Sequence, residues 1–243
     1  MRYIIFTLSL IFIIGCNTNK KELSEIEIDQ IVNSISDPEK LYDIALSMRF
    51  TRDYEQYEAS EFSTNDTIVL YIENYESEEK MFNRQIFFYQ NQPIFINEIG
   101  YKPVDGQEIQ YQQKIYLNNN EITSAYEAII EDENLESLKF KPIELNISKF
   151  DFNKPKNAVH QKGDFEMKFG EFLIIEPESY LILDNKKSKY TVALYIIDGD
   201  ETLNTLFEKQ NQSKGKTVFV YHEFVTMNGI NRMLYKGSYF VED

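Results

Sequence analysis

A strand–turn–strand pattern that occurs twice in the middle of the chain constrains its fold most. In the first copy, residues 85–89 lead through a turn at Gln90–Pro93 into residues 94–98. In the second copy, residues 112–117 lead through three asparagines into residues 121–126. Apolar and aromatic residues before an Asn-containing turn are typical of a β-hairpin. Two copies are too few for a solenoid, so the pattern predicts a twisted antiparallel meander.

The segment before the meander is expected to be helical. Apolar residues recur at helical spacing over residues 23–35, and Ser24 with Glu27 three residues later matches a capping box. Asp37 precedes a proline, and this pair predicts a second helix over residues 38–52. We therefore expect two N-terminal helices packed on one face of the meander.

The C-terminal part has a different order of elements. Asp200 follows a turn and is expected to cap a short helix. Three strands precede this helix and two follow it, which is the order of an OB-fold, a five-stranded and partly open barrel. The expected strands are residues 165–175, 180–183, 190–197, 217–224 and 232–241, with bends near Gly170 and Gly237.

These elements predict an α+β fold that is mostly antiparallel β, with N-terminal helices, a meander and an OB-like C-terminal barrel. Residues 154–157 have the composition of irregular chain. The expected division is a signal peptide at 1–15, a tether at 16–22, a helix-plus-meander domain at 23–150, a linker at 151–162 and an OB-like barrel at 163–243.

The first sixteen residues predict where the protein resides. Arg2 is followed by an apolar run that is too short to cross a bilayer core of about 30 Å as a helix, so this segment indicates a secretory signal. The run Ile13-Ile14-Gly15-Cys16 resembles the lipobox of bacterial lipoproteins, in which the Cys is lipidated and becomes the mature N-terminus. The resemblance implies several acyl chains on Cys16, which hold a protein firmly on a membrane. The alternative is an uncleaved N-terminal anchor helix.

The residue after Cys16 is Asn17 rather than Asp, which by the same resemblance implies an outer-membrane location. Whether the protein faces the periplasm or the cell surface stays open. The paired strand segments resemble uncharacterised exported lipoproteins of Bacteroidota, in which an aromatic-rich strand, an Asn/Asp-Gly turn and a second strand occur twice. Here the turns lack the Gly. This resemblance implies an exported compartment and a meander, and it brings no known activity.

The charge and the residue inventory exclude several classes of protein. The chain has 25 Lys and Arg against 40 Asp and Glu, a net charge of −15. This acid excess argues against nucleic acid as a partner, because phosphate-backbone binders need clustered basic residues. One Cys and two His leave little room for a multi-Cys zinc site or a His-rich centre, and we expect no cofactor.

Two clusters invite a chemical interpretation, and both have a structural one. His222 adjoins Glu223, but neighbours on a strand point to opposite faces and would not share a substrate. Asp198, Asp200 and Glu201 are weak metal candidates, since oxygen ligands suit Ca²⁺. They lack the alternating ligands and the distant bidentate Glu of an EF-hand, and Asp200 as a helix cap with Glu201 near the helix dipole explains the same residues. His160 has no acid near it in the sequence and is expected at the surface.

Two functional interpretations remain. The chain has no recognisable catalytic motif. We therefore expect a membrane-anchored, non-catalytic binding or interaction module of the cell envelope, whose partner is an unknown protein or small ligand. The alternative is a periplasmic or surface hydrolase with an unrecognised carboxylate site, which requires acids that converge in one pocket. The aromatic residues expected on the barrel's ligand face, with the nearby histidine, are Tyr180, Tyr195, Tyr221 and His222.

Overall fold

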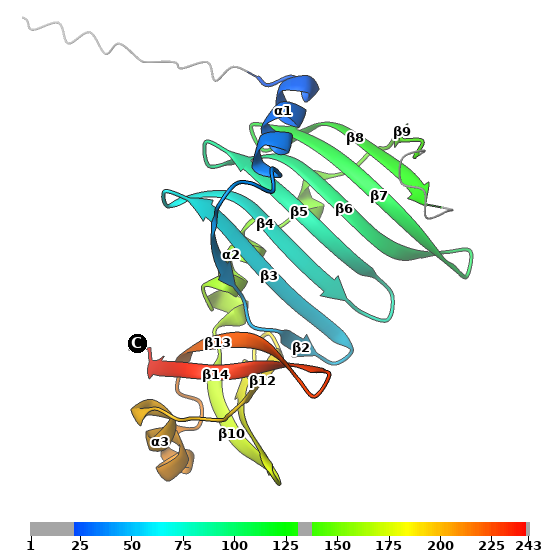
Figure 1. Cartoon of the computed structure of the whole chain (residues 1–243). Coiled ribbons are helices and arrows are strands. Elements are labelled where there is room, and N and C mark those ends of the chain that lie inside the picture. The colour runs from blue at the N-terminus through cyan, green and yellow to red at the C-terminus, as the bar shows by residue number, and fades with distance from the viewer. Residues whose placement is uncertain (1–21, 131–137, 242–243) are drawn as a thin grey trace, which may run out of the picture.

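The computed structural model describes residues 22–130 and 138–241, which form a mostly antiparallel β structure with a few short helices (Figure 1). This confirms the coarse prediction of an α+β chain dominated by antiparallel strands. The N-terminal part contains α1 (Glu25–Ile35), β1 (Asp43–Leu46), β2 (Phe50–Arg52), β3 (Glu55–Thr64), β4 (Thr67–Glu76), β5 (Met81–Tyr89), β6 (Gln92–Val104), β7 (Gln107–Asn118), β8 (Glu121–Ile130) and β9 (Lys141–Pro142).

The C-terminal part follows two short helical segments. These are the 3-10 helix η2 (Ile147–Lys149) and the α-helix α2 (Asn153–Val159). The remaining elements are η3 (Gly163–Phe165), β10 (Lys168–Ile175), β11 (Glu178–Asp184), β12 (Thr191–Tyr195), α3 (Glu201–Glu208), α4 (Gln210–Ser213), β13 (Val218–Met227) and β14 (Ile230–Phe240). The main sheet is open and follows the order β10-β11-β12-β2-β3-β4-β5-β6-β7-β8-β9.

Both predicted hairpins are present and lie side by side in one meander. The β5–β6 turn is Gln90-Asn91 and the β7–β8 turn is Asn119-Asn120, with positive φ at all four residues. Two-residue hairpin turns need left-handed backbone because only this twist matches the twist of the flanking strands. Asn enters that region more readily than most residues, which explains how these turns form without Gly.

The second predicted helix is wrong. Residues 43–46 and 50–52 are strands β1 and β2, and both pair with β3. The Asp37–Pro38 signal forms a turn instead, in which the Asp37 carboxylate accepts the N–H of Glu39 at 3.0 Å. The sheet gives this backbone its hydrogen bonds, and this tertiary pairing overrides the local helix signal.

Helix α1 covers one end of one face of the meander. The predicted capping box is confirmed, because the Ser24 hydroxyl accepts the N–H of Glu27 and the Glu27 carboxylate accepts that of Ser24. Ile28 and Ile35 are buried against Leu70, Phe87, Phe95 and Tyr116 of the sheet. The opposite face carries a second apolar cluster around Tyr71, Ile86, Ile96 and Ile115, which is covered by residues 143–152.

The C-terminal strands follow the predicted order, and two details of the prediction are confirmed. The β10–β11 register shifts at Gly170, and the β13–β14 register shifts opposite Gly237, whose φ is +148°. Strand β12 pairs with β11, pairs in parallel with β14, and meets β2 through Thr51 and Thr191. The prediction of irregular chain at 154–157 is wrong, because these residues lie in α2, which buries Pro155, Ala158 and Val159.

The predicted lipobox, Ile13 to Cys16, lies outside the described residues. Among residues 22–130 and 138–241, no helix has the length and apolar character needed to cross a membrane.

Candidate binding face of the central sheet

The face of the meander that carries α1 continues beyond the helix as three rows of side chains. The rows follow from the strand registers, since partners directly opposite each other share a face. We call these eighteen side chains the amide face. Its rows are Ser60, Ile72, Gln85, Asn97, Lys114 and Tyr126; Glu58, Asn74, Asn83, Ile99, Gln112 and Ala128; and Gln56, Glu76, Met81, Tyr101, Gln110 and Ile130.

The amide face differs in composition from the rest of this chain. Seven of its eighteen side chains are carboxamides, whereas Asn and Gln together make up 32 of the 243 residues. Only Glu58, Glu76 and Lys114 carry charge. All of its residues keep some solvent exposure except Ala128 and Ile130. The face is therefore an open, hydrogen-bonding and nearly uncharged surface on a strongly acidic protein.

The carboxamides bond to one another across the strands. Asn83 donates to Asn74 at 2.8 Å, Asn97 donates to Gln85 at 3.1 Å, and Gln112 donates to Asn97 at 2.7 Å. Each carboxamide has two N–H groups and an oxygen with two lone pairs, so one or two bonds leave capacity for a ligand. The cross-strand bonds also fix the orientation of these side chains, which lowers the entropy that a ligand must remove on binding.

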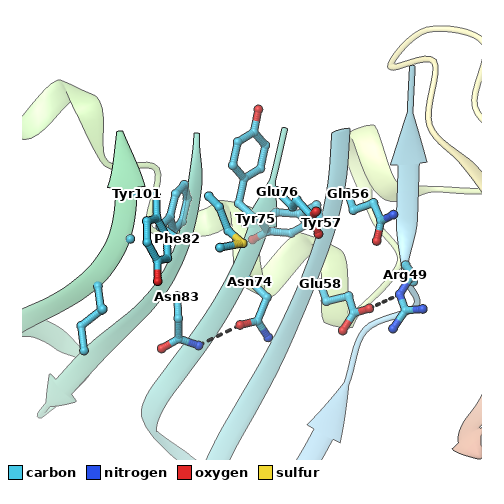
Figure 2. A pocket seen from close by; sticks show the side chains of 13 residues that line it. Arg49, Gln56, Tyr57, Glu58, Asn74, Tyr75, Glu76, Phe82, Asn83 and Tyr101 are labelled. Carbon is cyan, nitrogen blue, oxygen red and sulfur yellow. Dashed lines mark hydrogen bonds and ion pairs between the residues drawn. The ribbon is translucent and has the colours of Figure 1, made fainter. Parts of the chain in front are cut away.

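A groove of about 400 Å³ lies at the β3–β6 end of the amide face (Figure 2). Met81 and Ile99 provide apolar surface in it, and the Asn74–Asn83 pair and the Arg49–Glu58 ion pair line it as well. The other residues that line it, from β3 to β6, are Gln56, Tyr57, Tyr75, Glu76, Phe82, Gly100 and Tyr101. An apolar floor with a few fixed polar groups is the usual make-up of a ligand site.

Gly100 keeps this part of the sheet closely packed. A Cβ built on it would lie 2.4 Å from the carbonyl oxygen of Met81 and 2.9 Å from the Cβ of Phe82. Any larger residue would push β5 and β6 apart, and both strands line the groove.

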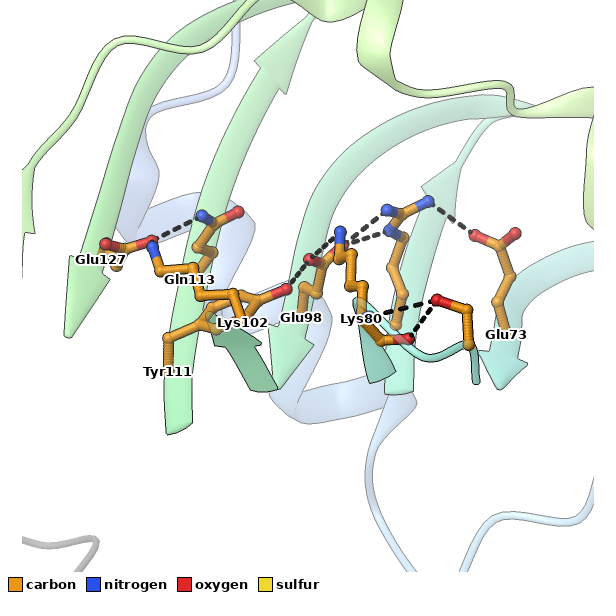
Figure 3. A network of polar contacts seen from close by, with 9 residues as sticks. Glu73, Lys80, Glu98, Lys102, Tyr111, Gln113 and Glu127 are labelled. Atoms are coloured by element: carbon orange, nitrogen blue, oxygen red, sulfur yellow. Dashed lines mark hydrogen bonds and ion pairs between the residues drawn. The ribbon is translucent and has the colours of Figure 1, made fainter. Parts of the chain in front are cut away.

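The opposite face of the same strands is charged and buried (Figure 3). Arg84 binds the Glu98 carboxylate through two nitrogens at 2.6 and 2.7 Å, and it reaches Glu73 at 3.2 Å. Lys80 lies 3.2 Å from Glu98, and the hydroxyl of Tyr111 donates to the same carboxylate. Both glutamates are about 2% exposed or less. The paired Lys102 and Glu127, at 2.7 Å, extend the network to β8.

The pKa values of Glu98 and Arg84 are both shifted in the direction that keeps the group ionised. Burial alone raises the pKa of the Glu98 carboxyl, but Arg84 and Lys80 outweigh it and hold the pKa below its usual value. The same pairing holds the pKa of Arg84 above its usual value, although burial opposes it. A general acid needs a carboxyl whose pKa is raised towards the working pH. Glu98 has the opposite shift, which is that of a carboxylate held ionised by its cationic partners.

The residues expected on the barrel's ligand face do not form one site. Tyr180 and Tyr195 pack together at 5.5 Å, and Arg232 donates to the Tyr180 hydroxyl at 2.6 Å while it lies over the Tyr195 ring. Tyr221 lies in a separate, exposed aromatic cluster with Phe219 and Tyr239. The ring of His222 packs edge-on against Phe224 at 5.5 Å.

His222 donates from Nε2 to the carbonyl of Ser47 at 3.1 Å, and burial lowers its pKa. Its neighbour Glu223 points elsewhere and lies 3.5 Å from Lys236, as the alternation of strand faces predicts. His160 is exposed, as predicted. It has an acidic neighbour that is remote in sequence, because its Nε2 lies 3.2 Å from the Glu61 carboxylate.

Asp200 serves as the predicted helix cap. Its carboxylate accepts the N–H of Leu203 at 2.7 Å, the N–H of Ser238 at 2.8 Å and the hydroxyl of Tyr235 at 2.8 Å. These bonds lower the pKa of Asp200 against the effect of burial. Among the residues that the structure describes, no three His, Cys, Asp or Glu side chains form a group that could hold a metal ion.

Comparisons with known proteins add no relative. No protein-family model matches the chain, and neither the curated proteins nor the solved structures contain a significant match.

Sequence reasoning missed the amide face, although the sequence contains a signal for it. Carboxamides recur two residues apart in β5 (Asn83, Gln85) and in β7 (Gln110, Gln112), and the residue between each pair, Arg84 or Tyr111, lies on the opposite face. This spacing predicts one polar face per strand. Only the register between strands shows that these positions form one continuous surface.

Proposed function

We propose that this protein is a lipid-anchored, non-catalytic binding protein of the bacterial envelope, and that the amide face holds an uncharged, hydroxyl-rich ligand of the glycan class. The single observation that carries the proposal is the threefold enrichment of carboxamides on an open sheet face that has few charges. Carboxamides donate and accept at once, as hydroxyl groups do, so the two match without a charged partner.

Two features of the face support a glycan over an ionic ligand. Tyr101 and Tyr126 add aromatic rings with polar ends, which suit the mixed apolar and hydroxylated surface of a sugar. Arg49 and Glu58 form an ion pair, so the charged residues that line the groove, Arg49, Glu58 and Glu76, sum to −1.

The sequence supports the location. The lipobox-like Ile13-Ile14-Gly15-Cys16 supports acylation of Cys16, and Asn17 supports the outer membrane, on its periplasmic or its outer side. Cys16→Ser tests this step. Metabolic labelling with an alkyne fatty acid should label the wild-type chain and not the variant, and the variant should leave the membrane fraction. A variant that stays labelled and membrane-bound would refute the anchor.

The C-terminal part fits an OB-like barrel. Strands β10, β11 and β12 pair in sequence, β14 joins β12 in parallel, β13 joins β14, and a single bridge from Lys168 to Thr217 links β10 to the start of β13. A helix between the third and fourth strands completes that order. We propose that this part supports the binding role, with Tyr180, Tyr195 and Arg232 packed on its outer surface.

Calorimetric titration with neutral oligosaccharides tests the ligand class. Maltohexaose, cellohexaose and chitohexaose are suitable probes, and at least one should bind the full chain and be recovered uncleaved. Asn83→Leu combined with Asn97→Leu should weaken that binding about tenfold or more, because unpaired sugar hydroxyls would be left facing apolar surface.

Asn211→Leu is the matched control, since Asn211 is an exposed carboxamide on α4, outside the amide face. It should leave the affinity unchanged. Equal affinity for the wild type and the double variant would refute the site, and failure of all three probes to bind would refute the ligand class.

A further inference from the structure

Strand β1 is an edge strand with a free outer side. It pairs with β3 over Asp43–Leu46, and the N–H of Ser47 donates to the carbonyl of Ala59 at 2.8 Å. In an antiparallel pair the bonded positions alternate, so the N–H and C=O groups of Ile44 and Leu46 point away from β3. No residue in the described ranges 22–130 and 138–241 donates to these groups or accepts from them.

The side chains of this edge are also uncovered. All four residues of β1 are exposed, Ile44 is 58% exposed and Leu46 is 45% exposed. Leu41, just before the strand, is 94% exposed. Isolated exposed apolar residues are ordinary, but here three of them lie on or directly before a strand with an unpaired backbone edge.

Proteins usually protect such an edge with Lys, Pro, a bulge or a very short strand. The far end of this sheet is protected in that way, because β9 consists of only two residues, Lys141 and Pro142. Strand β1 has neither residue type, and its register with β3 has no shift. Strand β1 therefore lacks the residue types that protect the edge at β9.

We propose that β1 binds an extended segment of a protein partner, which adds to the sheet as one more strand. The outward groups of Ile44 and Leu46 would pair with the backbone of that segment, and their side chains would contact its apolar residues. The turn and strand at 37–46 contain Asp37, Glu39 and Asp43 against Lys40, so the charge favours a segment with basic residues between its apolar ones.

A second copy of the chain is a poorer occupant, because each copy carries a net charge of −15 and the two copies would repel each other.

This site is independent of the proposed glycan site. The carboxamide-bearing strands β4 to β7 are paired on both sides, so they offer a ligand side chains only, whereas β1 offers backbone groups.

Fluorescence anisotropy with a labelled nine-residue peptide tests the proposal. The peptide alternates isoleucine or valine with lysine, and a control peptide has N-methyl groups on alternate residues, which remove its backbone donors. The full chain in detergent should bind the first peptide and bind the control at least about tenfold more weakly.

Ile44→Pro combined with Leu46→Pro removes the outward N–H groups and leaves the bonds to β3 in place. This variant should lose about tenfold or more in affinity, whereas Ile44→Val combined with Leu46→Val should keep it. Circular dichroism and the thermal midpoint of both variants establish that they fold. Both variants should bind oligosaccharides with the affinity of the wild type, which distinguishes this site from the amide face.

Three results would overturn the proposal. The first is no binding of the peptide at about 1 mM. The second is equal binding by the proline and valine variants. The third is a dimer in sedimentation velocity that the proline variant abolishes, because a second copy would then be the occupant.

Discussion

Replacing Arg84 with methionine would leave two buried carboxylates without their shared cation. Arg84 makes two short contacts to Glu98 and one to Glu73, and its own side chain is 11% exposed. After Arg84→Met, the cation left in contact with Glu98 would be Lys80, at 3.2 Å on a side chain that is 40% exposed. Glu73 would keep the hydrogen bond from the Tyr57 hydroxyl, at 2.8 Å.

The expected loss follows from the burial of these charges. Removing one partner of a buried ion pair typically costs about 3–5 kcal/mol, because the other charge stays desolvated. Lys80 and the tyrosine hydroxyls compensate in part, so we expect a loss of about 3 kcal/mol in the free energy of unfolding. Lys102→Met is the control, since that lysine is 33% exposed and its loss should cost about 1 kcal/mol or less.

Urea unfolding of the full chain at several pH values measures this cost. In the wild type the pKa of Glu98 is lowered, so its contribution is complete above pH 4.5 and is lost as the pH falls through the folded-state pKa. Without Arg84, burial raises that pKa and the carboxyl can protonate. The difference between wild type and Arg84→Met should therefore shrink as the pH falls from 7 to about 4.5. A cost below about 1 kcal/mol at pH 7, or a difference that grows in acid, would refute this reasoning.

Three further predictions concern other parts of the chain. Gly100→Ala should lower the free energy of unfolding by about 1–3 kcal/mol, because its Cβ would meet the Met81 carbonyl at 2.4 Å, and an unchanged urea midpoint would count against this close packing. Asp200→Ala should cost about 2 kcal/mol, since it removes the cap of α3 and the acceptor for Ser238 and Tyr235; Glu201→Ala, beside it, is the control in thermal unfolding. The pKa of His222 is lowered by burial, so the unfolded chain takes up the proton first and the free energy of unfolding should fall as the pH drops below 6.5. A His222→Asn variant should show a flatter dependence of that free energy on pH between about 7.5 and 5.5. Identical pH profiles for the variant and the wild type would contradict this prediction.

Local signals in the sequence predicted a good part of the fold. The Asn-containing turns at 90–91 and 119–120 are readable because few residue types accept left-handed backbone. The capping box at Ser24 and the cap at Asp200 are readable because each satisfies backbone donors within three residues. The helix predicted over 38–52 was wrong because its local signal competes with β3, a partner that no short window contains.

The sequence was a poorer guide to the candidate sites. The tyrosines at 180, 195 and 221 were grouped because they share a predicted barrel, but their strands separate them into two clusters. His160 and Glu61 are 99 residues apart and meet only because α2 packs on β3. Contacts of this kind depend on topology, which the spacing of residues along the chain does not encode.

By itself, the sequence determined the class of fold, the positions of most turns and caps, and the excess of negative charge. These properties depend on residue type and on neighbours a few positions away, so they can be inferred from one sequence. Only the tertiary structure decided which residues face one another. A carboxamide in β4 and another in β7 belong to one surface because strand register aligns them. Glu73 and Glu98, each next to a carboxamide in the sequence, are buried because the alternation of side chains turns them to the other face. The candidate site is a property of that register, since the alignment of six strands places seven carboxamides on one open face.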